Sequence, residues 1–170
     1  MKHLQRLVAL FLLLIVPFTH AWADEYADTI SIFRNAGESG DFFYNSYGYA
    51  VFPTIGKGGI GIGGAYGKGL LYEGGKPTAE VSLSQLTVGF QWGGQAYSEF
   101  LFFEDDAALK DFKRGNFELG AQVSAVAVTV GASADAKFNH GVAIFTYAKG
   151  GLMYEATVGG QKFKVSDKKF

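Results

Sequence analysis

Glycine and bulky side chains alternate along residues 57–72, KGGIGIGGAYGKGLLY. Every odd position from 59 to 69 is glycine except Ala65, whereas the even positions carry mostly aliphatic or aromatic side chains and one lysine. Because successive strand side chains point to opposite faces, the pattern predicts a strand with one nearly bare face. Glycine in a strand costs about 0.5 to 1 kcal/mol relative to alanine, so we expect a close neighbour on that face. The glycines assigned to this close packing are Gly59, Gly61, Gly63 and Gly64.

The glycine-rich segment has two other interpretations, of which the first stays open and the second is disfavoured. The bare face can instead leave a crevice for an acyl chain. Gly59, Gly61 and Gly64 also spell the G-x-G-x-x-G of a nucleotide-binding loop, which has meaning only where a strand ends and a helix begins. Further glycines at 67 and 69 make the following residues a poor helix start. We therefore expect no nucleotide ligand.

Helical periodicity occurs in two places. Tyr26, Ile30 and Phe33 share one helical face within 24–38, which predicts an amphipathic N-terminal helix with acids in its first turn. Residues 105–114 predict one short helix, with acids before it, basic residues near its end and a glycine after it. The aromatic residues between 42 and 47 are expected to form a short helical turn.

Strands account for most of the remaining chain. They are expected at 49–55, 57–72, 79–92, 93–103, 117–132, 141–147, 151–158 and 161–165. Residues 93–103 are expected to pair antiparallel with 79–92, and turns at 149–150 and 159–160 to join the last three strands. The pattern predicts a β-rich α+β fold with a strongly curved antiparallel sheet, barrel-like or sandwich-like, packed by one or two helices.

Alternation within 79–92 indicates a half-buried strand. Leu86, Val88, Phe90 and Trp92 share one parity, which we interpret as the apolar face of this strand. The opposite parity carries glutamines at 85 and 91, and Gln95 repeats the pattern in the next strand. These glutamines either line a polar crevice or face water.

The N-terminus has the form of a secretory signal peptide. Lys2 and Arg6 precede the apolar run 7–18, and Ala21-Trp22-Ala23 matches the small-x-small cleavage pattern. We expect residues 1–23 to be removed and 24–170 to form a single domain, exported to the periplasm or otherwise associated with the cell envelope. The alternative is an anchor that is retained.

Composition narrows the chemistry. The chain has no cysteine, and 16 acidic residues outnumber 15 basic ones, so disulfides and general nucleic-acid binding are not expected. Twenty-four glycines, 16 phenylalanines and nine tyrosines fit a curved β structure.

His140 is the lone histidine after the signal peptide, which leaves no common zinc or nucleophilic arrangement. We expect no enzyme activity, metal or cofactor, and assign the acids at 104–106 to capping of the short helix rather than to calcium.

Four blocks of the chain resemble the SYLF domain family, in the family's order. They are YAVFPTIGKGGIGIGGAYGKGLLY, GGQAYSEFLFF, ALKDFKRGNFELGAQVSAVAV and GVAIFTYAKGGLMYEATVGGQKF, which together run from about Tyr49 to Phe163. The resemblance implies a binding module without enzyme activity. In animal and fungal members the domain binds membrane lipids, notably phosphoinositides, and in some cases actin filaments.

The N-terminal segment departs from those members, in which a basic or amphipathic segment makes much of the contact. Between residues 24 and 43, Arg34 is the single basic residue against five acids. The headgroup preference therefore stays open. Actin is not expected as a partner in a bacterial envelope, and no protein partner is identified.

Candidate lipid-binding residues lie in and after the glycine block. Lys57, Lys68 and Lys76 can hold a phosphate headgroup while Tyr66 contacts acyl chains or the interface, or these lysines are ordinary solvated residues. The block QAYSEF adds Gln95, Tyr97 and Glu99 on one strand face. If Glu99 is buried it needs a partner, for which Lys57 is a candidate, and the alternative is a hydrogen-bond network that fixes strand register.

We therefore expect a non-catalytic domain that binds phospholipid, phosphoinositide-like or otherwise anionic, at a membrane of the cell envelope. The alternative is a small structural β-barrel associated with the outer membrane, or an envelope domain that binds another protein. Lysines at 162, 164 and 168 disfavour a lipid-facing C-terminal strand.

Overall fold

The computed structural model describes residues 18–89, 94–115, 117–120, 123, 125–128, 136–149 and 158–167, with 18–23, 60–61 and 87–89 described by their backbone alone. Its helices are α2 (Phe18–Asn35), α3 (Phe42–Asn45) and α4 (Asp106–Lys113). Its strands are β1 (Gly48–Glu73), β2 (Lys76–Gly89), β3 (Gln95–Phe103), β4 (Phe117–Glu118), β5 (Val126–Ala127), β6 (Val142–Ala148) and β7 (Lys162–Ser166). The expected strand at 151–158 lies almost wholly outside the described residues.

The helix α2 packs through the predicted face. Phe33 is fully buried, and Tyr26 and Ile30 are partly buried against the same cluster. The helix begins at Phe18, earlier than expected, so its first turn contains no acidic residue and that prediction is wrong. It ends at Asn35, close to the expected end.

The short helix α4 forms where its flanking residues predict it. Asp105 is the N-cap, and its carboxylate accepts a hydrogen bond from the backbone N–H of Ala108 at 2.8 Å. Gly115 follows the helix with a φ of 69°, the left-handed conformation that favours glycine. Capping thus explains the acid at position 105. The expected aromatic turn also forms, as α3.

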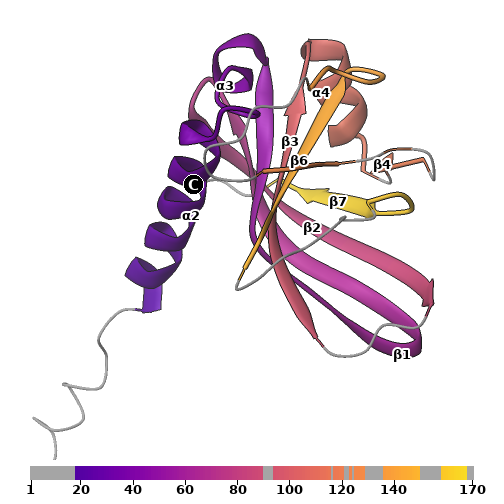
Figure 1. Ribbon diagram of the computed structural model, residues 1–170. Coiled ribbons are helices and arrows are strands. Elements are labelled where there is room, and N and C mark those ends of the chain that lie inside the picture. The colour runs from indigo at the N-terminus through magenta and orange to yellow at the C-terminus, as the bar shows by residue number, and fades with distance from the viewer. Residues whose placement is uncertain are drawn as a thin grey trace, which may run out of the picture.

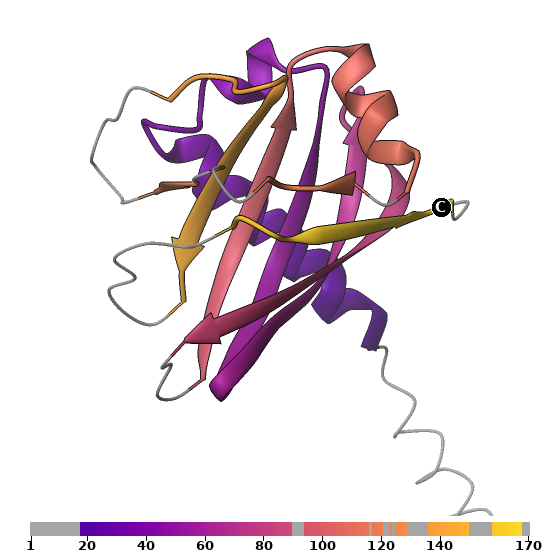
Figure 2. The ribbon, with the colours of Figure 1, turned by 90° about the vertical axis from the view of Figure 1, so that its right-hand side faces the viewer.

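One strongly curled sheet makes up the body of the domain. Its strand order is β4-β7-β2-β1-β3-β6-β5, and every pairing is antiparallel except that of β5 with β6. In Figure 2, α2 lies behind the sheet while β4 and β7 cross in front of it, and Figure 1 shows the same arrangement from the side. The predicted β-rich α+β fold with a strongly curved sheet is confirmed.

The long strand β1 folds back on itself, so that it supplies two neighbouring arms. A Cβ built on Gly48 would approach the backbone of Tyr72, and one built on Gly69 would approach the backbone of Val51. At the bend, Gly59 has a φ of 146° and a Cβ there would meet the backbone of Gly63. The first arm pairs with β3 and the second with β2.

This bend overturns one predicted pairing. The described part of β3 pairs with β1 and β6, whereas β2 pairs with β1 and β7. The expected direct pairing of 93–103 with 79–92 is therefore wrong. Both arms of β1 lie between these strands, because the glycine-rich segment bends sharply instead of running on as one straight strand.

The two faces of the sheet bury separate apolar clusters. The outer face, against α2 and α3, carries an aromatic cluster that includes Phe33, Phe100 and Phe102. The inner face of the curl packs against α4 and includes Leu71, Leu83 and Phe163. We use the terms outer face and inner face for these two sides.

The side-chain alternation of β2 is the reverse of the predicted one. Ala79, Val81 and Leu83 are buried on the inner face, as is Gln85, whereas Leu86 is 85% exposed on the outer face. The apolar parity thus changes between Leu83 and Leu86. Phe90, Gln91 and Trp92, which entered the same prediction, lie outside the described residues.

Candidate functional site

Three apolar side chains lie exposed together on the outer face of β1 and β2. Ile62 is 74%, Tyr66 55% and Leu86 85% exposed. Gly64 of β1 pairs directly with Leu86 of β2, so Ile62 and Tyr66 flank Leu86 diagonally on one face. The exposed Lys68 follows two residues after Tyr66 and shares this face. We call Ile62, Tyr66, Lys68 and Leu86 the outer patch.

The position of α2 explains why the outer patch stays uncovered. Tyr72, near the other end of β1, packs within the α2 cluster and stacks on Tyr49 with ring centroids 5.0 Å apart. The outer patch lies farther along the strands, where β1 and β2 extend beyond α2 (Figure 1). Large exposed apolar side chains gathered on one face indicate an interaction surface.

The predicted lysines do not form one cluster. Lys68 belongs to the outer patch. Lys76 lies opposite Glu73 in the backbone register of β1 and β2, beside the turn at Gly74-Gly75. Ten residues of extended strand separate Lys76 from Leu86, a span of about 33 Å. Lys57 is partly buried, and this burial lowers the pKa of its ammonium group.

A second group of predicted residues faces the inside of the curl. Lys57 pairs with Gln95 across β1 and β3, and Tyr97 and Glu99 continue the same face of β3. Gln95 is exposed, but Tyr97 is 1% and Glu99 0% exposed. The structure therefore separates Gln95, Tyr97 and Glu99 from Tyr66 and Lys68, which lie on the outer face.

Glu99 is held by an amide and not by an ammonium group. Gln161 Nε2 donates to Glu99 Oε2 at 3.0 Å and to the hydroxyl of Tyr97 at 3.3 Å. No salt bridge of Glu99 occurs within the described residues, so Lys57 is not its ion-pair partner there. Burial raises the pKa of Glu99 to about 8, against a smaller lowering by the Gln161 hydrogen bond.

The turn at 158–161 holds Gln161 in place. Its backbone N–H donates to the carbonyl of Val158 at 3.1 Å, and its carbonyl accepts from the N–H of Leu119 at 2.9 Å. From the other side, Gln85 Nε2 donates to the carbonyl of Gly159 at 2.9 Å. The sequence assigns Gln161 no role beyond being the first residue of the strand expected at 161–165. In the structure it precedes β7, and its side chain is fully buried.

The glycines of β1 differ in how closely they are approached. A Cβ on Gly64 would lie 3.1 Å from the carbonyl oxygen of Gln85, a tight but adjustable contact. The closest approaches within the straight part of the second arm are at Gly67 and Gly69, which the sequence-based assignment omitted. Gly63 is half-buried. Gly61 is described by its backbone alone.

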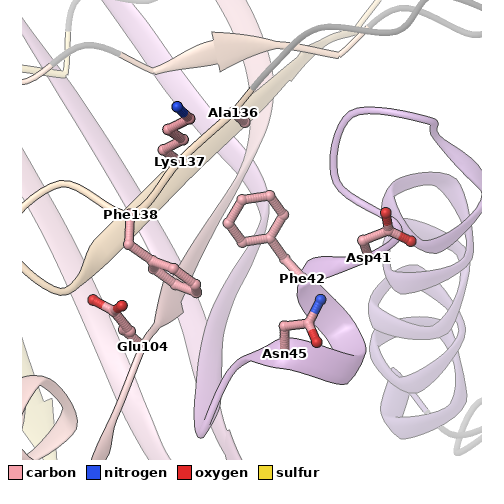
Figure 3. A pocket seen from close by; sticks show the side chains of 7 residues that line it. All are labelled: Asp41, Phe42, Asn45, Glu104, Ala136, Lys137 and Phe138. Carbon is pink, nitrogen blue, oxygen red and sulfur yellow. The ribbon is translucent and has the colours of Figure 1, made fainter.

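A separate pocket of about 490 Å³ opens beside α3. It is lined by Asp41, Phe42, Asn45, Glu104, Ala136, Lys137 and Phe138. Figure 3 shows the rings of Phe42 and Phe138 pointing toward one another, and their centroids lie 5.0 Å apart. None of the residues predicted from the sequence as candidate site residues lines this pocket.

The fold and the outer patch together define a β-rich α+β domain with an uncovered apolar surface. The family model described as "Ysc84: Las17-binding protein actin regulator" matches residues 84–169, slightly more than half of the chain. The chain therefore belongs to this family, the SYLF domain family, and the resemblance noted from its sequence is confirmed.

The chain is also similar to Beta cell expansion factor A of Aeromonas veronii. The two are 31% identical over 142 residues, which cover 81% of this chain and 53% of that protein. The chain thus spans about half the length of this curated relative. No helix in the described part of the chain is long and apolar enough to cross a membrane.

Proposed function

We propose that the domain binds the surface of anionic phospholipid membranes through the outer patch, without catalysis. The observation that carries the proposal is the exposure of Ile62, Tyr66 and Leu86 on one face, with the cation of Lys68 beside them. Apolar side chains of this size gain free energy by leaving water, at roughly 25 cal/mol per Å² of buried apolar surface. An adjacent lysine adds about 1 kcal/mol near an anionic surface.

Family membership supports a lipid-binding or actin-binding type of domain. The family description names an actin regulator, but the expected export of this chain disfavours actin as its partner. We propose the cell envelope as the site of action, on the basis of the signal-peptide pattern at residues 1–23. Lys57 and Gln95 lie on the inner face, so we assign them no first contact with the membrane.

Co-sedimentation with vesicles tests the proposal. Vesicles of phosphatidylcholine with and without phosphatidylglycerol are mixed with the mature chain and with a triple variant, Ile62→Ser, Tyr66→Ser, Leu86→Ser. We expect the wild type to sediment with anionic vesicles and the triple variant to stay in the supernatant.

A matched control removes an exposed aromatic side chain elsewhere. Tyr44 on α3 is 82% exposed and lies outside the outer patch, so Tyr44→Ser should sediment as the wild type does. Equal sedimentation of the wild type and the triple variant would show that the outer patch does not carry membrane binding. A triple variant that binds a protein partner less tightly, with no vesicle binding by either form, would favour the protein-interaction alternative.

A further inference from the structure

The hydrogen bonds of Gln161 cross the inside of the curled sheet. Gln161 precedes β7, while Tyr97 and Glu99 belong to β3. In the strand order, β2 and both arms of β1 separate β7 from β3. The bonds at 3.0 and 3.3 Å therefore join two distant parts of one sheet across its interior, where the neighbouring contacts are aromatic, such as Phe52 with Phe163 at 5.8 Å between centroids.

This polar link leaves buried oxygen atoms without partners. Glu99 Oε1, Gln161 Oε1 and Thr146 Oγ1 have no hydrogen-bond partner among the described residues, and each of the three side chains is at most 1% exposed. Glu99 pairs directly with Thr146 across β3 and β6, so their side chains share the inner face, with Cβ atoms about 5 Å apart. The neutral carboxyl form of Glu99 is far more stable in this buried environment than its carboxylate form, because burying an unpaired charge costs free energy.

The other ionisable groups on this face do not offset that cost. Tyr97 is the ionisable side chain next to Glu99 on β3, and burial, followed by the charge of Glu99, raises the pKa of its phenol well above the usual range. Lys57 lies at the end of the same face and pairs with Gln95, without an ion pair to Glu99 among the described residues. Thr146 and Gln161 do not ionise in the accessible pH range.

We propose that Glu99, Tyr97 and Gln161 form a clasp across the curled sheet, which holds while Glu99 carries a proton and loosens when Glu99 loses it. When the clasp loosens, water reaches the carboxylate of Glu99. This water supplies the hydrogen bonds that the interior does not provide. The turn at 158–161 moves away from β3, and the inner apolar cluster becomes more accessible. This property concerns the inside of the curl and does not depend on membrane binding by the outer patch.

A distance measurement between spin labels tests the clasp directly. The chain has no cysteine, so Gln95→Cys on β3 and Lys164→Cys on β7, both at exposed positions, give two unique labels. Electron–electron distance distributions are recorded for the doubly labelled chain at pH 5.5 and pH 8.5. We expect a narrow distribution at pH 5.5 and a broader, longer one at pH 8.5.

Two variants separate the clasp from a general effect of pH. Glu99→Gln keeps the size and polarity of the side chain but cannot ionise, so it should give the narrow distribution at both pH values. Gln161→Ala removes the link itself and should give the broad distribution at both. A wild-type distribution that is unchanged between the two pH values would overturn the proposal, as would a Glu99→Gln variant that still broadens at pH 8.5.

Discussion

Gly69 lies directly against Phe52 on the neighbouring arm of β1. A Cβ at Gly69 would come 2.7 Å from Cδ1 of the Phe52 ring, and 2.5 Å from the carbonyl oxygen of the residue before it. Since Phe52 is fully buried, its ring has little room to move away. Close packing, rather than a crevice for an acyl chain, therefore explains the bare backbone at this position.

The first prediction concerns this contact. Gly69→Ala should lower the free energy of unfolding by about 1 to 3 kcal/mol, the usual cost of forcing extra atoms into a packed interior. Thermal melting with a denaturant titration measures the change. Gly56→Ala is the matched control on the same strand, because a Cβ there meets nothing within 4 Å. If Gly69→Ala and Gly56→Ala have the same free energy of unfolding, the close contact at Gly69 does not contribute to stability.

Local sequence patterns predicted the helices and strands better than they predicted which strands pair with one another. The buried face of α2, including Phe33, follows from helical periodicity, and the Asp105 cap follows from residue types within four positions. The bend at Gly59 depends on a positive φ that glycine permits but does not require. Without knowledge of that bend, the sequence alone does not reveal that β1 separates β2 from β3.

The candidate site was predictable only in part, for a similar reason. Tyr66 and Lys68 are exposed where a lipid contact was expected, but Leu86 was assigned to a buried face because its parity matched Val88. The sequence does contain a sign that the buried face of β2 carries the odd positions, because Val81 and Leu83 are apolar and both are buried. The partner of Glu99 comes from a residue 62 positions away, which no local pattern indicates.

The second prediction concerns processing of the N-terminus. The cleavage pattern at Ala21-Trp22-Ala23 predicts a mature chain that begins at Asp24, which would shorten α2 to its last twelve residues. The remaining helix keeps Glu25, whose carboxylate accepts from Thr54 Oγ1 at 2.6 Å and from Lys149 Nζ at 3.0 Å. The intact mass of the protein isolated from the cell envelope is the measurement, and a mass that includes residues 1–23 would contradict the cleavage and favour the retained anchor.

The third prediction concerns charge at the membrane. Because Lys68 lies in the outer patch and Lys76 lies about 33 Å from Leu86 along the strand, only Lys68 should contact a surface touched by the patch. Lys68→Gln should weaken binding to phosphatidylglycerol-containing vesicles by up to about fivefold at low salt, corresponding to about 1 kcal/mol. The difference should shrink in high salt, which screens surface charges.

Lys76→Gln serves as the control for Lys68→Gln, because it removes the same charge from the same two-stranded region. Vesicle co-sedimentation at two salt concentrations compares the three proteins. Equal weakening by both substitutions would indicate that only the net charge of the domain matters. Binding that ignores salt and both substitutions would place the contact on another surface.

The fourth prediction concerns stability and pH. Burial raises the pKa of Glu99 from its ordinary value of 4.5 to about 8 in the folded protein, so the folded state binds one more proton than the unfolded state between these values. The stabilisation from this group is therefore fully present below pH 4.5 and is lost as the pH rises to about 8. The loss is at most about 5 kcal/mol, and water entering through a loosened clasp reduces it.

Glu99→Gln isolates that contribution, because glutamine is neutral at every pH in this range. Melting temperatures measured at several values between pH 5 and pH 8.5 should fall for the wild type and change much less for Glu99→Gln, so the difference between the two proteins grows with pH. The variant should be the more stable protein at pH 8.5, where the wild type carries a buried carboxylate with a single amide donor among the described residues. Parallel pH profiles for the two proteins would show that Glu99 ionises as it does in the unfolded chain, and that its burial imposes no proton linkage on folding.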